Sequence, residues 1–315
     1  MKYRILNTIG KEFDPKAKEV LDRVAKVDYK IPTQKQLLKI IGDYDYVLCG
    51  LGLNFDKEVL SKAKNLKSIA TATTGLDHID IKFAEERGIK ILSLRGENEF
   101  LDTITGTAEL ALGIMITLAR NAHTSYKAVL NGEWDREKFK GHSLFGQTLG
   151  IVGLGRLGKM MARYGHALGM KVIYTDPNVD LNIKEYKKVE LEQLLKESDF
   201  ISIHIHLKPE TEYLFNSNTI SKMKSSAYII NTSRGKIVNE KDIINAIKNK
   251  RIAGYGTDVL DGELAFIKND CSNHIIVKYA KKNPNVFIVP HIGGMTHESR
   301  RDTDVFIAKK LASVI

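Results

Sequence analysis

Short apolar runs alternate with charged amphipathic segments along most of the chain. In its first hundred residues the apolar runs predict strands at 3–7, 46–49, 68–72 and 89–92. The segments between these runs have apolar residues at helical spacing and predict helices at 15–23, 33–40, 57–62 and 81–86. This alternation predicts a small α/β unit.

The pattern changes at residues 105–122, TGTAELALGIMITLARNA, where a long apolar run carries little charge before Arg120. It predicts a helix that is buried on most sides, either between domains or in a subunit contact. The segment that follows, up to Gly146, contains the only tryptophan, Trp134, among polar residues. We expect it to form an arm that packs either on a partner subunit or on its own domain.

Residues 148–177, TLGIVGLGRLGKMMARYGHALGMKVIYTDP, predict a strand, a glycine turn, a helix, a second strand and an acid. Gly153, Gly155 and Gly158 have the G-x-G-x-x-G spacing of a dinucleotide-binding turn. The first glycine permits the tight turn, the second lets a pyrophosphate approach the backbone, and the third lets the helix pack close to the strand. The partly positive end of the helix then points at the phosphates.

Asp176, at the end of the second strand, decides which dinucleotide is expected. Its carboxylate can accept hydrogen bonds from both ribose hydroxyls of an adenosine and would repel a 2′-phosphate, so the sequence predicts NAD rather than NADP. A solvated acid that opens an Asp-Pro turn is the alternative interpretation of this residue.

The strand and helix alternation continues after Asp176 and predicts a doubly wound parallel sheet. Expected strands lie at 200–205, 227–231, 252–257 and 286–289, and expected helices at 191–197, 219–223, 240–249 and 296–311. Residues 264–282 show no clear pattern.

Composition narrows the class of protein. With 315 residues and 43% hydrophobic residues, the chain has room for two domains with real cores. The formal net charge of +10 comes from scattered lysines, so no nucleic-acid partner is expected. Cys49 and Cys271 lack the spacing of a disulfide framework or a metal site, and no metal is expected. No signal peptide or transmembrane run is expected either, which predicts a cytoplasmic protein without a membrane partner.

Three polar side chains each follow a predicted strand of the second sheet, where loops converge on a cofactor crevice. They are Arg234, Glu263 and His291. An arginine offers a planar fork to a carboxylate, and a histidine exchanges a proton near neutral pH. A glutamate beside that histidine would orient the imidazole and favour its protonated form. Taken singly, each also has an ordinary interpretation as a turn residue, a surface acid or a capping residue.

Taken together and in order, several segments resemble the D-isomer-specific 2-hydroxyacid dehydrogenase family over nearly the whole chain. They are ATTGLDHID, TGTAELALGIMITLAR, GQTLGIVGLGRLGKMMA, SDFISIHIHLKPET, INTSRGKIVNEKDIINAIKNKRIAGYGTDVLDGE and PNVFIVPHIGGMTHESRRDT. The resemblance implies an α/β protein in which a Rossmann-type doubly wound parallel sheet is inserted into a smaller, discontinuous, flavodoxin-like substrate domain. Residues 1–98 plus 291–315 would form the substrate (catalytic) domain, and residues 99–290 the NAD-binding domain.

The resemblance also implies roles for individual residues. Arg234 would bind the substrate carboxylate, His291 would protonate the carbonyl oxygen as hydride arrives, and Glu263 would support His291. The remaining implied site residues are Arg156 and Leu157 at the pyrophosphate, Thr232, Ser233 and Asp258 near the nicotinamide, and the backbone of Thr74 and Gly75 at the substrate carboxylate.

This chain departs from the family's pattern in places. His206 stands where a proline is usual, Leu264 replaces the proline that commonly follows the glutamate, and the run to His291 is long. No arginine lies around Leu51–Asn54, where phosphoglycerate-specific members tend to have one, which argues against a phosphorylated substrate. Formate oxidation is disfavoured because that branch has glutamine at the position of Glu263.

We therefore expect a homodimeric, NAD-dependent oxidoreductase that interconverts a small D-2-hydroxy acid and its 2-oxo acid, such as glyoxylate, hydroxypyruvate or pyruvate. A 3-phosphoglycerate dehydrogenase and a NAD(H)-sensing interaction protein of the same fold are the alternatives.

Overall fold

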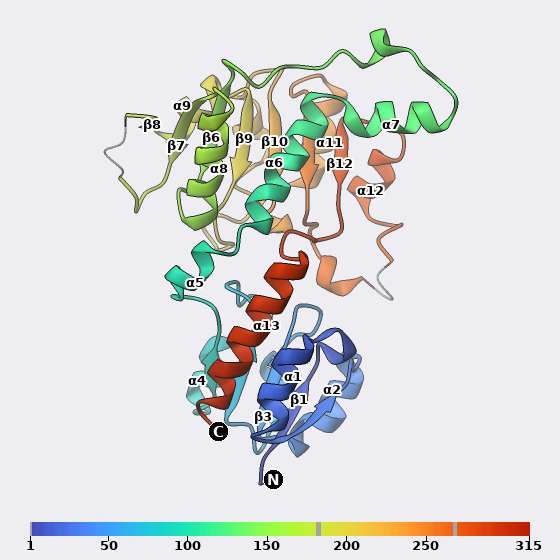
Figure 1. Cartoon of the computed structure of the whole chain (residues 1–315). Coiled ribbons are helices and arrows are strands. Elements are labelled where there is room, and N and C mark those ends of the chain that lie inside the picture. Colours follow the sequence, from blue (N-terminus) through green and yellow to red (C-terminus); the bar gives the residue numbers. More distant parts are fainter. Residues whose placement is uncertain (1, 181–183, 267–269) are drawn as a thin grey trace. The chain divides into compact units, whose positions relative to one another are not determined.

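The computed structural model describes residues 2–180, 184–266 and 270–315 and divides the chain into two compact units (Figure 1). Unit 1 contains the residues up to Ile104 together with Met295–Ile315, and unit 2 contains Thr105–Gly294. The boundaries thus lie at 104/105 and 294/295, whereas the family resemblance implied 98/99 and 290/291. His291 therefore belongs to unit 2.

Unit 1 is built on a parallel sheet with the strand order β2-β1-β3-β4-β5, which is the flavodoxin-like order. Its strands are β1 (Arg4–Asn7), β2 (Lys26–Tyr29), β3 (Tyr46–Cys49), β4 (Ser68–Thr71) and β5 (Lys90–Leu92). The sequence pattern did not predict β2, because this edge strand is only partly buried and carries the polar residues Lys26 and Asp28.

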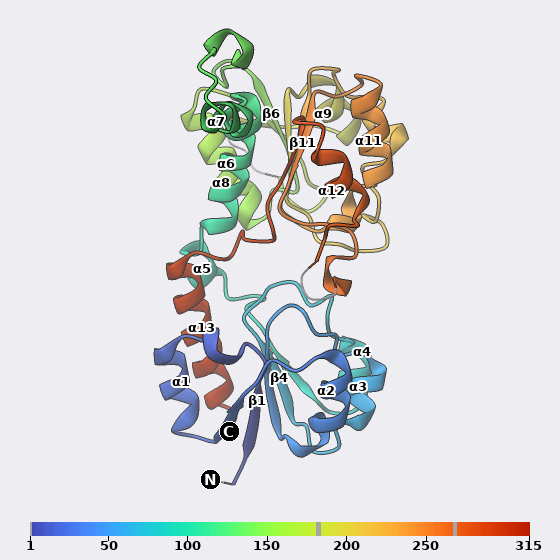
Figure 2. The ribbon, with the colours of Figure 1, turned by 90° about the vertical axis from the view of Figure 1, so that its right-hand side faces the viewer.

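Helices cover both faces of this sheet (Figure 2). They are α1 (Pro15–Asp22), α2 (Gln34–Ile40), α3 (Lys57–Lys62), α4 (Ile81–Glu86) and α13 (His297–Ala312). A further helix of unit 1, α5 (Asn98–Asp102), stacks Phe100 on Phe306 of α13. Asp14 begins α1 by accepting hydrogen bonds from the backbone N–H groups of Lys16 and Ala17. Helix α13 packs along α1 and reaches β4 and β5, so a late segment of the chain completes the core of unit 1.

Unit 2 is built on a parallel sheet with the strand order β12-β11-β10-β9-β6-β7-β8. Its strands are β6 (Thr148–Val152), β7 (Lys171–Thr175), β8 (Tyr186–Lys188), β9 (Phe200–Ile203), β10 (Tyr228–Asn231), β11 (Gly254–Thr257) and β12 (Val286–Ile288). The strand order reverses between β6 and β9, and ligands of open α/β sheets bind at such a switch point. The Rossmann-type doubly wound sheet expected from the sequence is confirmed.

The helices of unit 2 lie on opposite faces of this sheet, with α6 and α8 on one side and α9, α11 and α12 on the other (Figure 2). The bounds are α6 (Gly106–Ala119), α7 (Ala122–Leu130), α8 (Arg156–Ala167), α9 (Leu191–Glu197), α10 (Ser217–Ile220), α11 (Glu240–Lys248) and α12 (Ile275–Ala280). Helix α12 lies in the segment whose sequence showed no clear pattern. Its buried Ile276 joins the cluster of apolar side chains beneath α11.

The sequence pattern predicted no run that could span a membrane. The 22-residue stretch Asn98–Ala119 is nevertheless long and apolar enough, by length and composition, to cross one. In the structure the stretch contains α5 and α6, and α6 packs against β10 and β11. The contact is tight: a Cβ on Gly256 of β11 would lie 2.2 Å from Ile114. Helix α6 is thus a core helix of unit 2.

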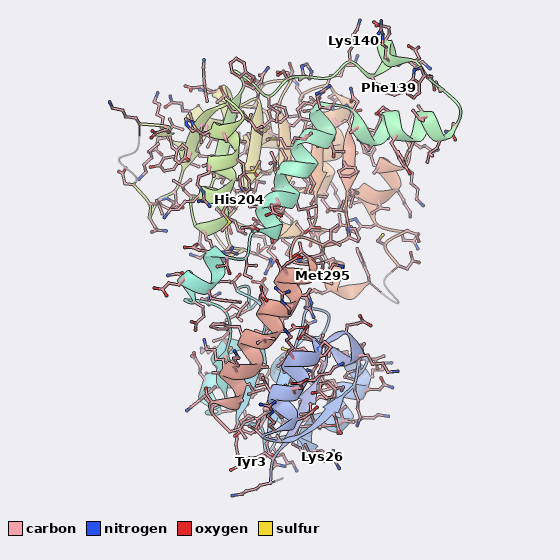
Figure 3. The ribbon with its side chains drawn as sticks, in the orientation of Figure 1. Tyr3, Lys26, Phe139, Lys140, His204 and Met295 are labelled. Carbon is pink, nitrogen blue, oxygen red and sulfur yellow. The ribbon has the colours of Figure 1, made fainter. Side chains whose placement is uncertain are left out.

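The arm after α6 begins with α7, which the sequence pattern did not predict and which has no buried residue. Trp134 is 89% exposed, so the arm does not tuck this side chain against its own domain. Figure 3 shows Phe139 and Lys140 on the same arm, beyond α7. The apolar residues that it exposes include Tyr126, Leu130 and Phe145.

We predict that Asp304→Asn changes how the stability of the protein depends on pH. Asp304 on α13 accepts a hydrogen bond from the Asp14 backbone N–H at 3.2 Å and pairs with Arg300, and burial raises its pKa from 3.8 to about 6. A raised pKa means that folding takes up a proton, so this contribution to wild-type stability is present below about pH 4 and is lost as the pH rises through about 6. The loss amounts to about 3 kcal/mol.

The asparagine variant lacks this titration. Its free energy of unfolding, measured by urea denaturation, should therefore rise relative to that of the wild type as the pH rises from about 4 to 6. Parallel curves for the two proteins would contradict the prediction.

Candidate active site

The glycine turn follows β6 at the switch point of the unit 2 sheet. Gly153 has φ +91°, and a Cβ there would lie 2.6 Å from the backbone oxygen of His204. A Cβ on Gly158 would lie 2.0 Å from the backbone oxygen of Gly153, so the third glycine lets α8 pack close to the strand. A Cβ on Gly155 would meet no atom of the described residues within 4 Å, so the second glycine faces open space among them. This is the geometry that a pyrophosphate group needs.

Asp176 follows β7 and binds the backbone of the glycine turn as well as its own turn. Its carboxylate accepts hydrogen bonds from the backbone N–H groups of Leu154 at 2.8 Å, Asn178 at 2.8 Å and Val179 at 3.1 Å. The turn-opening role considered from the sequence is therefore real. A carboxylate has about four acceptor sites, so these bonds leave it able to accept from a ribose hydroxyl. Arg156 and Leu157 are the first residues of α8, beside the turn.

The loop after β10 holds Arg234 in an extended conformation before a short 3₁₀ turn, Gly235–Ile237. Asn231 fixes this loop, because its side chain accepts from the Ser233 N–H and donates to the Arg234 carbonyl. Ser233 in turn donates to the carbonyl of Ile203 at the end of β9, and the Arg234 guanidinium donates to the Ser233 carbonyl.

Thr232 has a buried hydroxyl oxygen without a hydrogen-bond partner among the described residues. A bound cofactor would provide one.

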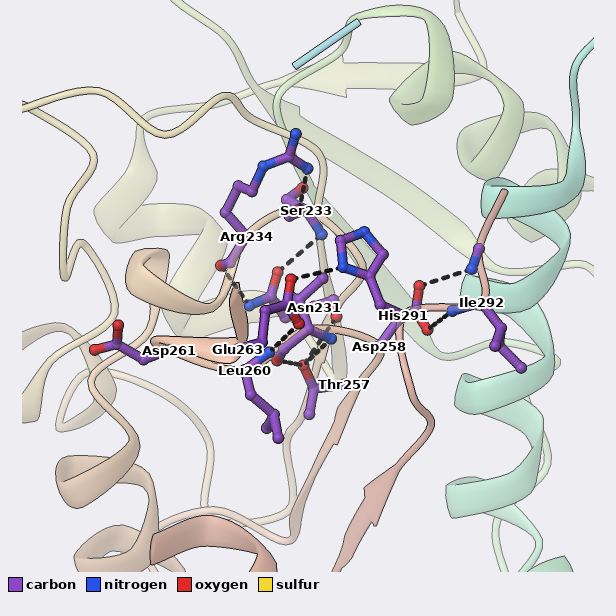
Figure 4. Close-up of polar contacts among 12 residues, drawn as sticks. Asn231, Ser233, Arg234, Thr257, Asp258, Leu260, Asp261, Glu263, His291 and Ile292 are labelled. Atoms are coloured by element: carbon purple, nitrogen blue, oxygen red, sulfur yellow. Dashed lines mark hydrogen bonds and ion pairs between the residues drawn. The ribbon is translucent and has the colours of Figure 1, made fainter. Parts of the chain in front are cut away.

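The loop after β11 carries Glu263 at the start of another 3₁₀ turn, Glu263–Ala265. One oxygen of its carboxylate, Oε2, accepts a hydrogen bond from the Leu260 N–H at 3.0 Å. The other oxygen, Oε1, lies 2.6 Å from Nδ1 of His291 (Figure 4). Because an ionised carboxylate only accepts, the bonded Nδ1 carries hydrogen and leaves Nε2 to exchange a proton with a substrate.

His291 follows β12 and has the left-handed backbone angle φ +52°, which is uncommon for a residue other than glycine. Asp258, after β11, holds the backbone around it. The Asp258 carbonyl accepts from the His291 N–H at 2.8 Å, and its carboxylate accepts from the N–H groups of Ile292 at 2.6 Å and Gly293 at 2.8 Å. Burial raises the pKa of Asp258 to about 6, and these backbone bonds oppose the rise. These bonds tie residues 291–293 to unit 2.

The structure brings Arg234, Glu263, His291 and Asp258 together at one edge of the unit 2 sheet. The side chains of Arg234 and His291 project to the same side of the loops in Figure 4. Thr74 and Gly75 belong to unit 1, in the loop after β4. There the Thr73 hydroxyl donates to the Gly75 carbonyl at 2.7 Å and also contacts the Thr71 hydroxyl at 3.0 Å, which gives this loop a defined conformation.

Sequence reasoning missed a polar cluster beneath Glu263, formed by Glu240, His274 and Tyr213 around Asp261. The Tyr213 hydroxyl donates to the Asp261 carboxylate at 2.7 Å, and the buried Glu240 lies 3.4 Å from His274. These four residues come from four separate segments, so no spacing in the sequence brings them together. From the sequence alone, Glu240 is indicated only as an acid in the first turn of a helix.

Two glycine variants should separate cofactor contact from folding. Gly155→Ala should fold with an unchanged melting temperature and bind NADH about tenfold more weakly, because the added methyl occupies open space where the pyrophosphate would lie. Gly158→Ala should lower the melting temperature, because its methyl meets the Gly153 backbone. Circular dichroism and NADH fluorescence measure the two effects, and equal effects of both variants would contradict this assignment.

Known proteins resemble this chain in sequence and in fold. Residues 112–293 match the family model described as "D-isomer specific 2-hydroxyacid dehydrogenase, NAD binding domain". The chain is 36% identical to a glyoxylate reductase of Thermococcus litoralis, over 90% of this chain and 84% of that protein. It is 32% identical to a D-3-phosphoglycerate dehydrogenase of Methanocaldococcus jannaschii over 94% of this chain, but it spans only 55% of the length of that relative.

A solved structure has the same fold. The D-lactate dehydrogenase of Aquifex aeolicus, complexed with NAD and lactic acid, superposes with a TM-score of 0.88 at 28% identity, over 99% of this chain and 95% of that one. The family model spans more than half of the chain, from α6 to the residues that follow His291. The chain therefore belongs to the D-isomer specific 2-hydroxyacid dehydrogenase family, and unit 2 carries its NAD-binding domain.

Proposed function

We propose that this protein is an NAD-dependent oxidoreductase that interconverts a small D-2-hydroxy acid and its 2-oxo acid. The observation that carries the proposal is the 2.6 Å contact between His291 and Glu263, at the same edge of the sheet as Arg234 and the glycine turn. A partly buried carboxylate that orients an imidazole beside a carboxylate-binding arginine suits protonation of a 2-oxo acid.

In the direction of reduction, each residue of the site has a separate role. NADH, when bound, supplies the hydride. Arg234 offers its guanidinium fork to the substrate carboxylate and so orients the carbonyl group. His291 donates the proton on Nε2 to the carbonyl oxygen, and Glu263 keeps Nδ1 protonated and stabilises the imidazolium before transfer. In the oxidative direction the same Nε2 accepts the hydroxyl proton.

The more specific part of the proposal concerns the size of the substrate and whether it carries a phosphate group. The glyoxylate reductase relative supports a small substrate such as glyoxylate, hydroxypyruvate or pyruvate. The D-3-phosphoglycerate dehydrogenase relative favours the alternative, 3-phosphoglycerate. The absence of an arginine around Leu51–Asn54 supports the unphosphorylated class, because a phosphate group would need a cationic partner.

An NADH-consumption screen across 2-oxo acids of increasing size and charge, with 3-phosphoglycerate oxidation measured alongside, tests the proposal. Turnover of 3-phosphoglycerate alone would overturn the choice of substrate. A protein that binds NADH and oxidises it with no acid of the panel would overturn the enzymatic proposal. It would then favour the NAD(H)-sensing interaction protein, which a partner pull-down with and without NADH would detect.

We also propose a homodimer in which the arm after α6 packs on a second copy of the chain. The arm exposes Tyr126, Leu130, Trp134 and Phe145, with fractions of 65, 67, 89 and 78%. Aromatic and aliphatic side chains that gather on one projecting segment are typical of subunit contacts. Sedimentation of the wild type and of Trp134→Ser tests this, because a monomeric wild type would contradict it.

Arg234→Ala should lower kcat/KM for the 2-oxo acid by about 100-fold or more, since the substrate loses both its charge partner and its orientation. The dissociation constant of NADH should stay within about twofold, because no contact of the glycine turn changes. Lys236→Ala is the matched control: Lys236 lies two residues further on, is exposed and pairs with Glu212 at 3.3 Å. Unchanged kcat/KM in the Arg234 variant would remove this residue from the site.

Glu263→Gln should shift the alkaline limb of the kcat/KM profile for reduction to lower pH. The glutamine keeps the size of the side chain but removes the negative charge that favours protonated His291 at 2.6 Å. The acid form of His291 is then lost earlier as the pH rises, while activity at low pH suffers less. A limb at the wild-type position would show that Glu263 does not support the charge of His291.

A further inference from the structure

The peptide that joins Leu260 and Asp261 is a common support for the two sides of the candidate site. Gly235, which follows Arg234, packs directly on it: a Cβ at Gly235 would lie 2.1 Å from the Leu260 carbonyl carbon and 2.2 Å from the Asp261 nitrogen. The Leu260 N–H also donates to the Glu263 carboxylate. The position of this short segment therefore affects both the arginine loop and the glutamate.

The buried side chain of Glu240 and the largely buried side chain of His274 hold the backbone of Asp261. Glu240, the first residue of α11, accepts a hydrogen bond from the Asp261 N–H at 3.2 Å through Oε1. His274, which precedes α12, places Nε2 at 3.0 Å from the Asp261 carbonyl oxygen and at 3.4 Å from Oε2 of Glu240. Because a carbonyl oxygen only accepts, Nε2 of His274 carries the hydrogen. Both polar groups of the Asp261 backbone are thus bound.

The two side chains are themselves held firmly. Glu240 and His274 have side chains only 5% and 14% exposed, and the His274 ring contacts Phe266 edge to face at 5.6 Å. The next residues along α12 include Ile276, which is fully buried in the main core of unit 2. A movement of Asp261 would therefore have to break hydrogen bonds or displace core packing.

Asp261 transmits its position to Glu263 over a very short stretch of chain. Only Gly262, with φ +74°, separates the two residues. Glu263 then orients His291 through the 2.6 Å contact. A shift at Asp261 would change the geometry of that contact, and proton transfer is sensitive to such a change.

We propose that Glu240 and His274 form a clamp on Asp261 that positions Glu263, and through it His291, for proton transfer. Neither residue touches the reacting atoms, so both are positioning residues. The inference rests on the proposed function for its catalytic consequence, although the arrangement of the clamp does not depend on the substrate.

The charge around Glu240 supports a role beyond filling space. His274 faces it from the residue before α12, and Asp261 and Glu263 face it from the loop after β11. Burial, followed by the two carboxylates, raises the pKa of Glu240 to about 7, while the Asp261 N–H opposes the rise. An ionised carboxylate at this position costs free energy that an apolar side chain would avoid. The ionised carboxylate accepts a hydrogen bond from the Asp261 N–H, which an apolar side chain could not do.

Titration of His291 by NMR tests the clamp without a substrate. The protein is labelled with ¹³C at Cε1 of its nine histidines, and the His291 signal is assigned by its loss in His291→Asn. His274→Phe keeps an aromatic ring and loses the donor, whereas His274→Gln keeps an N–H for the Asp261 carbonyl. The variant Glu263→Gln shows how His291 titrates when the Glu263 carboxylate is absent. Asn283→Ala is the control, because it removes a 2.8 Å side-chain bond to the carbonyl of Tyr279 just beyond α12.

We expect His274→Phe to move the titration midpoint of His291 to lower pH, towards that of Glu263→Gln, and His274→Gln to recover most of the difference. The control should match the wild type. An unchanged midpoint in folded His274→Phe would overturn the clamp, and so would an equal shift in the control. If circular dichroism shows that the phenylalanine variant does not fold, His274→Leu takes its place with the same two outcomes.

Kinetics then connect the clamp to the reaction. His274→Phe should lower kcat about tenfold and leave KM for the 2-oxo acid and the dissociation constant of NADH within about twofold, as expected of a residue that positions a catalytic group. A rise in KM with unchanged kcat would overturn the positioning role. If the wild type turns over no 2-oxo acid, the proposed function fails while the NMR titration still decides whether the clamp exists.

Discussion

The candidate site depends on the parallel arrangement of the unit 2 strands. Parallel strands end at the same edge of a sheet, so every loop that follows a strand emerges there. The glycine turn follows β6, Asp176 follows β7, Arg234 follows β10, Asp258 follows β11 and His291 follows β12. Residues more than a hundred positions apart thus gather without any local sequence signal for one another. An antiparallel strand among them would send its loop to the opposite edge.

Two carboxylates near His291, the buried Asp258 and the partly buried Glu263, serve different purposes because their surroundings differ. The Asp258 carboxylate binds the backbone N–H groups of Ile292 and Gly293, so it shapes the chain around the imidazole. The Glu263 carboxylate binds the imidazole itself. The strained backbone of His291, with φ +52°, is sustained by the first carboxylate, while its ring orientation is sustained by the second. Backbone and ring are therefore controlled separately.

The sequence was most informative where one residue type has one physical use. Glycines at a fixed spacing, long apolar runs and an arginine or histidine after a strand predicted the fold class and the residues that gather in unit 2. Short or exposed elements were missed, since β2 is only half buried and α7 buries nothing. Glu240 and His274 were also missed, because hydrogen bonds to the backbone of Asp261 depend on three-dimensional proximity that no spacing encodes.

The packing of α13 on α1 has a consequence for how the chain folds during synthesis. The sheet of unit 1 is made first, yet the face that bears Ile5 and Ala70 needs Ile307 and Leu311 of α13 to complete its core. Unit 2 is continuous in sequence, so all of it leaves the ribosome before α13 is available. We expect unit 2 to be protease-resistant in nascent chains that end before α13, and unit 1 to remain sensitive until that helix emerges.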